Sequence, residues 1–361
     1  MIPCFPTDAK WGAGAFGERR RVVQTGLMLK MFLAGAALLA SCGAALPVQT
    51  QKGAGAKEAA AGAAESRPAS KVLDAAQLLE DVRALSSDAM EGRAAGTKGG
   101  LSARAYVERR FVDAGLKPFW SDFRQPFALP KKEGRVAEGA NLVGQVQGAK
   151  HPERLVVVTA HYDHLGVRDG AVYNGADDNA SGVAVLLQLA AHFARERPQN
   201  TLVFAALDAE ESGLVGAREL VKKLRAEQRD VALEVNLDMV GHSERGELYA
   251  AGTHHTPALR PLLERVAARA PVKLLLGHDR PEQGHDDWTN QSDQFAFHQA
   301  GVPFVYFGVE DHRDYHKPTD DFETLTRDFF VRAAETVLDA VETLDSGLGE
   351  VTKAKRGGRQ G

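Results

Sequence analysis

"RLVVVTAHYDHLGVRDGAVYNGADDNASGVAVLLQLA", residues 154–190, contains the two kinds of segment that decide the fold of this chain. It opens on 154–160, a continuous apolar run with β-branched residues, which is typical of a strand buried on both faces of a sheet. It closes on an apolar run that predicts a helix at 181–195. Between the two lie histidines and aspartates, and Asp177 and Asp178 are adjacent.

The alternation of strand and helix continues on both sides of this stretch. Apolar spacing predicts further helices at 72–85, 102–115, 213–226, 257–269, 293–300 and 326–345. Strands are predicted at 201–207, 231–238, 272–276 and 302–308, and extended segments around 119–127 and 140–146. This alternation favours the α/β fold class, as a three-layer sandwich with a mostly parallel central β-sheet flanked by helices.

The composition narrows the kind of partner and the kind of site. The chain has 361 residues and a net charge of −4, and no basic stripe interleaved with aromatics is present, so nucleic acid is not expected as a partner. Its two cysteines, Cys4 and Cys42, both precede the first predicted helix. Any metal site in the folded body must therefore use histidines and carboxylates.

The ends of the chain read differently from its body. Residues 1–42 resemble an export signal, because a basic stretch precedes a short apolar run, and "LASC" resembles a bacterial lipoprotein signal with the lipid on Cys42. That would place the protein at the periplasmic face of the envelope; a plain secretion signal or a lone anchor helix is the alternative. We expect 43–70 to be a flexible linker, 71–345 the folded domain, and 346–361 an unstructured basic tail.

Potential metal ligands follow four of the predicted strands. In such sheets ligands bind at the carboxyl ends of the strands, so these side chains should meet at one edge. Taken singly, each group has an ordinary explanation, such as a polar loop or an acidic helix N-terminus. Together they indicate a site, and they comprise His161, Asp163 and His164, then Asp208, Glu210 and Glu211, then Asp238, and then His312, Tyr315, His316, Asp320 and Asp321.

Imidazole and carboxylate without sulfur suit a cation such as Zn²⁺. One catalytic zinc needs only three protein ligands, and this set is larger. The surplus predicts two metal ions that share a bridging carboxylate, an arrangement found in hydrolases that include aminopeptidases.

Five segments of the sequence resemble metallopeptidase family 28, the two-zinc aminopeptidases related to glutamate carboxypeptidase. In order, they read "TAHYDHLG", "NGADDNASGVA", "LDAEESGLVGA", "NLDMVG" and "YHKPTDD". The resemblance covers about residues 72–345, and "SDAMEGRAAGT" (87–97) is similar to a segment of the bacterial branch. It implies a zinc exopeptidase fold of the phosphorylase/hydrolase-like type, two Zn²⁺ per chain and peptide substrates.

The resemblance also assigns roles to individual residues. It implies that Glu210 is the general base and Glu211 a metal ligand. In the alternative assignment, Glu210 is the ligand. Asp163 would orient a ligand imidazole, and Tyr315 would help to hold the developing oxyanion. The peptide bond after Asp178 would be cis. The implied metal ligands are His161, Asp178, Glu211, Asp238 and His316, with Asp178 as the bridge.

Several residues keep open readings. "NQSDQFAF" resembles a family segment that would place Asp293 in the substrate pocket, but Ser292 and Asp293 also suit a helix N-terminus. Asp177 would be a turn former or an acceptor near the site. Six further histidines have no assigned role and are expected to be loop or rim residues, namely His164, His254, His255, His278, His285 and His312.

Three other functions remain to be weighed against an aminopeptidase. A carboxypeptidase or dipeptidase could use the same site. A glutaminyl cyclase is a related single-zinc acyltransferase, and the number of zinc ions per chain would separate the two. A metal-free binding protein is the third alternative, although all five ligand positions hold competent residues.

Overall fold

Strand β4 (His151–His161) lies between two parallel neighbours, β7 (Asn200–Leu207) and β8 (Asp230–Leu237). The computed structural model describes residues 69–129 and 138–357. β4 is long because its apolar run, 155–158, can be buried on both faces, and all four of these residues are 3% exposed or less.

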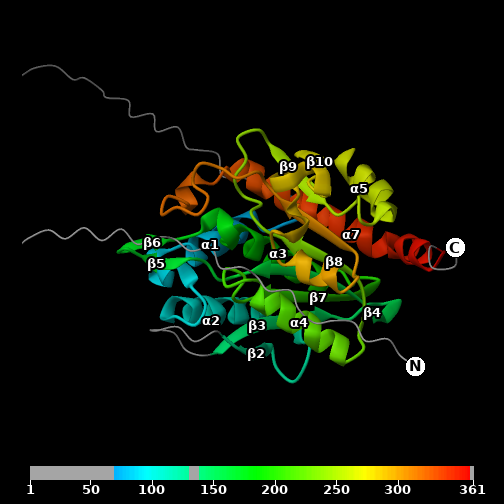
Figure 1. Ribbon diagram of the computed structural model, residues 1–361, viewed down its shortest axis with the longest axis horizontal. Coiled ribbons are helices and arrows are strands. Elements are labelled where there is room, and N and C mark those ends of the chain that lie inside the picture. The colour runs from blue at the N-terminus through cyan, green and yellow to red at the C-terminus, as the bar shows by residue number, and fades with distance from the viewer. Residues whose placement is uncertain (1–68, 130–137, 358–361) are drawn as a thin grey trace, which may run out of the picture. The chain divides into compact units, whose positions relative to one another are not determined.

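Within the described residues, nine strands form one mixed sheet (Figure 1). Its centre, in the order β7, β4, β8 and β11 (Phe304–Gly308), is parallel. Both flanks contain antiparallel pairs, through β3 on one side and β9 on the other. The flanking strands are β1 (Lys117–Pro118), β2 (Arg124–Ala128), β3 (Glu138–Val146), β9 (Glu247–Ala251) and β10 (Lys273–Leu276).

Helices cover both faces of the sheet, which completes the three layers and confirms the predicted α/β fold class. One face is buried beneath α1 (Ala75–Leu85), α2 (Lys98–Asp113), α3 (Gly182–Arg195), α5 (Arg260–Ala267) and α7 (Arg327–Gly357). The opposite face packs against α4 (Val215–Ala226) and α6 (Gln294–Gln299). In β4 the side chains alternate between the two cores, with Val156 and Val158 on the first side and Leu155 and Val157 on the second.

The last helix is longer than the sequence analysis predicted. The tail was expected to be unstructured from residue 346, whereas α7 continues through Gly357. The apolar repeat of the helix extends past that point, because Leu344, Leu348 and Val351 are all buried. Spacings of four and three residues keep these side chains on one face of the helix, so the helix stays packed against the body.

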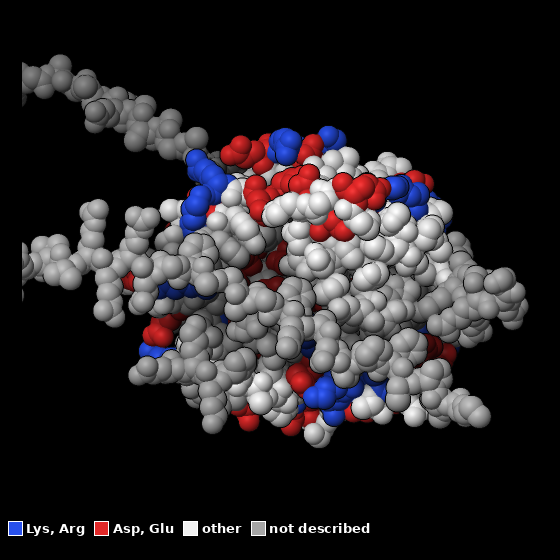
Figure 2. Space-filling view, viewed as in Figure 1, with Lys and Arg blue, Asp and Glu red and all other residues white. Residues whose placement is uncertain are grey.

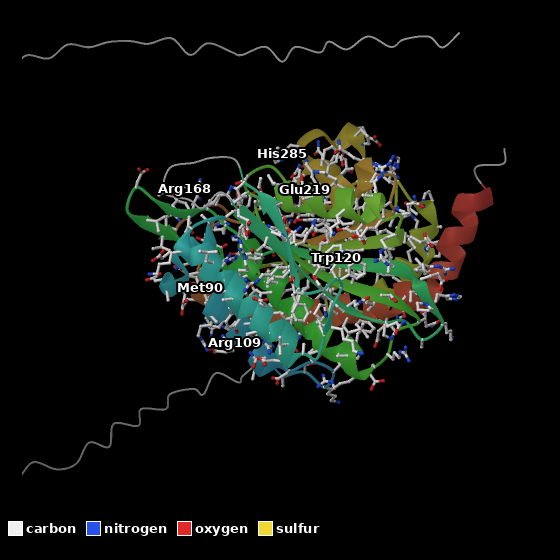
Figure 3. All side chains as sticks on the ribbon, turned by 90° about the horizontal axis from the view of Figure 1, so that it is seen from below. Met90, Arg109, Trp120, Arg168, Glu219 and His285 are labelled. Atoms are coloured by element: carbon white, nitrogen blue, oxygen red, sulfur yellow. The ribbon has the colours of Figure 1, made fainter. Side chains whose placement is uncertain are left out.

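Two further elements were not predicted. β9 has only five residues and pairs antiparallel with β11. The hairpin of β5 (Gly166–Arg168) and β6 (Ala171–Tyr173) carries Arg168, which is labelled in Figure 3. Its turn is Asp169–Gly170, both with positive φ, as a two-residue hairpin turn requires. That dipeptide was a usable signal for the hairpin.

The two N-terminal segments of the sequence analysis, 1–42 and 43–70, lie outside the described residues except for 69–70. Among residues 69–129 and 138–357, no helix has the length and apolar character needed to cross a membrane.

Candidate metal centre

The first cluster of potential ligands forms where two neighbouring parallel strands end. His161 is the last residue of β4, and Asp238 directly follows β8. His161 Nε2 lies 3.2 Å from Asp238 Oδ1 and 3.5 Å from Asp178 Oδ1. All three residues are buried and offer ligand atoms that converge on one point, so this group could hold a cation.

The second cluster shares Asp178 with the first. The other oxygen of Asp178, Oδ2, lies 3.1 Å from His316 Nε2, and that nitrogen lies 3.7 Å from Glu211 Oε1. Asp178 therefore presents one carboxylate oxygen to each cluster, which is the geometry that a bridging ligand needs. The structure brings all five sequence-predicted ligands to one edge of the sheet.

His164 belongs to the second cluster. The sequence analysis noted it among the polar residues at the strand ends but expected a loop or rim histidine and not a metal ligand. Its side chain is buried, and its Nδ1 lies 2.9 Å from Glu211 Oε1 and 3.7 Å from Asp178 Oδ2. Burial lowers the pKa of His164 to about 3, so the ring is neutral. Its position three residues after His161, just past the end of a buried strand, was a signal that could have identified it.

Burial and mutual repulsion dominate the electrostatics of the site. Burial raises the pKa of Glu211, and it raises the pKa of Asp163 and of Glu210 well above their usual ranges. Burial opposes protonation of His161, but Asp238 and Glu210 raise its pKa well above the usual value. So many carboxylates in one place need positive charge nearby, and a divalent cation would supply it.

The buried polar atoms fit a metal as well. Asp163 Oδ2, Glu211 Oε1 and both ring nitrogens of His164 have no hydrogen-bond partner within the described residues. Buried polar atoms are almost always paired, so this concentration of unpaired ligand atoms at one place indicates a bound ion. Figure 2 shows Asp and Glu side chains recessed in a hollow of the face that it displays.

Asp163 and Glu210 lie beside the first cluster. The backbone N–H of Glu210 donates to Asp163 Oδ1 at 3.0 Å. Glu210 is partly buried in the loop after β7, directly before the potential ligand Glu211. Tyr315 stacks on His316 with ring centroids 4.0 Å apart, and burial raises the pKa of its hydroxyl, which therefore stays protonated.

Asp177 is not part of either cluster but supports the loop that carries Asp178. Its Oδ1 accepts from the backbone N–H of Gly241 at 2.6 Å, and its Oδ2 lies 3.1 Å from His312 Nε2. His312 stacks on His242 with centroids 4.1 Å apart. Those two histidines and Asp314 form a third group of potential ligands, but both nitrogens of His312 are already in hydrogen bonds.

The loop with Asp178 is fixed from behind by Asp320 and Arg93. The Asp320 carboxylate accepts from the N–H groups of Asp177 and Asp178. Arg93 is fully buried, and within the described residues its guanidinium donates only to backbone carbonyls, those of Leu85, Tyr162, Asn174, Gly175 and Asp178. The peptide bond between Asp178 and Asn179 is cis, as the resemblance implied.

Asp293 lies close to the site but is not open to solvent. It occupies the N-cap position of α6 without capping the helix through its side chain, and both of its carboxylate oxygens lack a hydrogen-bond partner in the described part of the chain. Burial raises the pKa of Asp293 to about 7. Because its exposed fraction is 0%, Asp293 can contact a substrate only after a local rearrangement.

Comparison with known protein families gives a match over most of the folded body. The model of the family described as "Peptidase family M28" matches residues 141–341. Aminopeptidase YwaD of Bacillus subtilis is 31% identical over 214 residues, which cover 56% of this chain and 44% of that protein. The chain spans about half the length of the curated relatives that it matches.

Solved structures share the fold. BSAP, a zinc aminopeptidase from Bacillus subtilis, superimposes with a TM-score of 0.62 at 18% identity, covering 74% of this chain and 94% of that one. A glutaminyl cyclase from Bacteroides thetaiotaomicron gives a TM-score of 0.59 at 17% identity, covering 75% and 98%. At these identities the likeness concerns the fold alone.

Proposed function

The chain belongs to peptidase family M28, and from that premise we propose that it is a zinc-dependent aminopeptidase that removes residues from the free N-terminus of peptides. One observation carries the proposal: the buried Asp178 offers its two oxygens to two different ligand clusters, beside the partly buried Glu210. The similarity to an aminopeptidase of Bacillus subtilis supports the same reading.

The residues fit two metal ions. His161, Asp178 and Asp238 would hold one, and Asp178, Glu211 and His316 would hold the other. Zinc in such a site polarises a carbonyl group and lowers the pKa of a water molecule.

Glu210 is the residue that we assign to proton transfer. Its raised pKa, caused by burial, suits a group that takes a proton from water and passes it to the leaving amine. Its backbone is held by Asp163, so its side chain starts from a fixed position. Tyr315 remains protonated and can donate a hydrogen bond to the oxyanion that develops on the substrate.

The preference for a free N-terminus follows from charge. The recessed carboxylates make the hollow negative, and an α-ammonium group would be attracted to it (Figure 2). Glu210 and Asp238 are the carboxylates that we assign to this contact, since Asp293 is fully buried.

The test compares blocked and free substrates. Aminoacyl-nitroanilides should be cleaved by the metal-loaded chain, their N-acetylated forms should not, and a chelator should abolish cleavage. Equal rates on free and acetylated substrates would exclude an aminopeptidase. Cleavage of dipeptides with an acidic C-terminal residue, without cleavage of the nitroanilides, would indicate a carboxypeptidase or dipeptidase.

A single variant tests the proton transfer. Glu210→Gln should retain the wild-type metal content and lose on the order of 10²–10⁴-fold in kcat. A loss of metal in this variant would make Glu210 the ligand instead.

Metal stoichiometry separates the proposed peptidase from a glutaminyl cyclase, which would use one zinc. Both clusters here hold their full set of potential ligands, which favours two ions. A chain that binds one zinc tightly and cyclises N-terminal glutamine would contradict the peptidase proposal.

We also propose that the protein is exported and carries a lipid on Cys42. The proposal rests on the sequence of residues 27–42, "LMLKMFLAGAALLASC". Incorporation of labelled palmitate into the wild type but not into Cys42→Ala would support the proposal. A wild-type protein that takes up no label and does not fractionate with membranes would contradict it.

A further inference from the structure

His164 lies inside the site, but the proposed function assigns no role to it. It is 1% exposed, and it lies between the two residues Asp178 and Glu211. Its Nδ1 and Glu211 Oε1 are only 2.9 Å apart. Yet neither atom makes a hydrogen bond anywhere in the described residues.

Burial of these two unpaired atoms is unfavourable in free energy unless a third group interacts with both. A buried polar atom without a partner costs free energy, and here a donor and an acceptor lie close together without pairing. A cation that both atoms face would satisfy the two at once. The 3.7 Å separation from Asp178 Oδ2 places a third ligand atom at the same point, and these three atoms all lie within 4.8 Å of one another.

The backbone is built to admit this ring. Gly175 has a φ of +56°, and a Cβ atom added there would lie 2.5 Å from His164 Cδ2 and 2.7 Å from its Cγ. The nearest atom to such a Cβ would be the backbone oxygen of Asp178, so any other residue at 175 would force the Asp178 backbone or the His164 ring to shift. The glycine of "NGADD" both turns the loop and leaves room for the ring.

We propose that His164 is an additional ligand of the metal ion held by Asp178, Glu211 and His316. This inference rests on the proposed function only in that the site binds metal. The second cluster then offers four protein donors, the number that closes a tetrahedral zinc site, while the first offers three. The first cluster would then be the one with a position left for water and substrate, and the two sites would bind metal with different affinities.

The test measures metal binding, not catalysis, on the purified full chain with Co²⁺ as the probe. His164→Ala should bind the second ion at least about tenfold more weakly than the wild type, and the visible spectrum of that ion should change. His285→Ala is the matched control, because His285, labelled in Figure 3, is exposed and belongs to neither cluster, so its loss should leave both binding constants unchanged.

A second variant separates a ligand from a hydrogen-bond donor. The amide of His164→Asn can donate to Glu211 from nearly the position of Nδ1. If His164 only orients Glu211, this variant keeps the wild-type spectrum and affinity, which would overturn the proposal. If His164 is a ligand, His164→Asn behaves like His164→Ala.

The remaining outcomes are distinct from those of the proposed function. Wild-type affinity and spectrum in His164→Ala would overturn the ligand assignment and leave the peptidase proposal standing. A wild type that binds two Co²⁺ but cleaves no peptide would overturn the peptidase proposal and leave the ligand assignment standing. A wild type that binds no Co²⁺ would overturn both.

Discussion

Asp163 Oδ1 accepts a hydrogen bond from the backbone N–H of Glu210 at 3.0 Å, so the residue two after His161 holds the proposed base in place. The backbone carbonyl of Asp163 lies 3.1 Å from His161 Nδ1, whereas its carboxylate lies 3.8 Å from that nitrogen. The family resemblance implied that the Asp163 carboxylate orients the His161 imidazole. In the structure the closer contact comes from the carbonyl, and one residue connects a metal ligand with the base.

The division of labour in Asp163 can be tested with two substitutions. Asp163→Ala removes the acceptor for the Glu210 N–H and should lower kcat/KM by at least about tenfold. Asp163→Asn keeps an oxygen at that position and should retain more activity than the alanine variant. Steady-state kinetics on a nitroanilide substrate would measure both. Wild-type kinetics in Asp163→Ala would show that Glu210 needs no such support.

The adjacent aspartates should respond differently to substitution. Asp178→Ala removes an oxygen from each cluster and should abolish binding of the metal pair. Asp177→Asn weakens the contacts to Gly241 and His312, so it should lower the melting temperature but leave about two zinc ions per chain. Metal analysis after gel filtration would measure the stoichiometry. Loss of zinc in Asp177→Asn alone would contradict the assignment of Asp178 as the bridge.

Arg93 should stabilise the site through its hydrogen bonds to backbone carbonyls. Arg93→Met leaves these buried carbonyls unpaired and should lower the free energy of unfolding by at least about 3 kcal/mol. Arg93→Lys keeps the charge but has fewer donors, and its loss should be smaller. Urea unfolding would measure both, with Arg109→Met on the exposed side of α2 as control (Figure 3). Equal unfolding midpoints for Arg93→Met and the control would contradict this role.

Glu234 predicts a dependence of stability on pH. It is fully buried in β8, where burial raises its pKa well above the usual value. The Thr159 hydroxyl lies 2.7 Å from both Glu234 Oε1 and Asn236 Oδ1. It has one proton and can donate to only one of the two oxygens. When Thr159 donates to Asn236, a protonated Glu234 can complete the network by donating to the Thr159 oxygen.

The sign follows from the two pKa values of Glu234. The unfolded carboxyl loses its proton at a lower pH than the folded one, so its contribution to stability is complete below the unfolded pKa. That contribution is lost as pH rises toward the folded pKa, by up to about 1.4 kcal/mol per pH unit.

Glu234→Gln imitates the protonated form and should lack this loss. Urea unfolding of the wild type and the variant at several pH values should show the difference growing with pH, while exposed Glu153→Gln should follow the wild type. A constant difference across this range would contradict a neutral Glu234.

The architecture could be predicted because the strands and helices follow from local patterns of apolar residues. Continuous apolar runs such as 155–158 identified the central strands, and apolar spacing identified the helices. The potential ligands could be found because carboxyl ends of parallel strands share an edge, so His161 and Asp238 had to meet. The far end of α7 was missed because a polar, glycine-containing stretch concealed Leu348 and Val351.

The sequence by itself determined the class of site and the residues at the strand ends, since these depend on the order of elements along the chain. Only the tertiary structure decided what surrounds them. His164 faces Glu211 across 46 intervening residues, and Arg93 reaches the carbonyl of Gly175 across a gap of 82 positions. Such contacts depend on how loops pack at the sheet edge, where a buried polar atom without a partner costs free energy, and no local pattern encodes that packing.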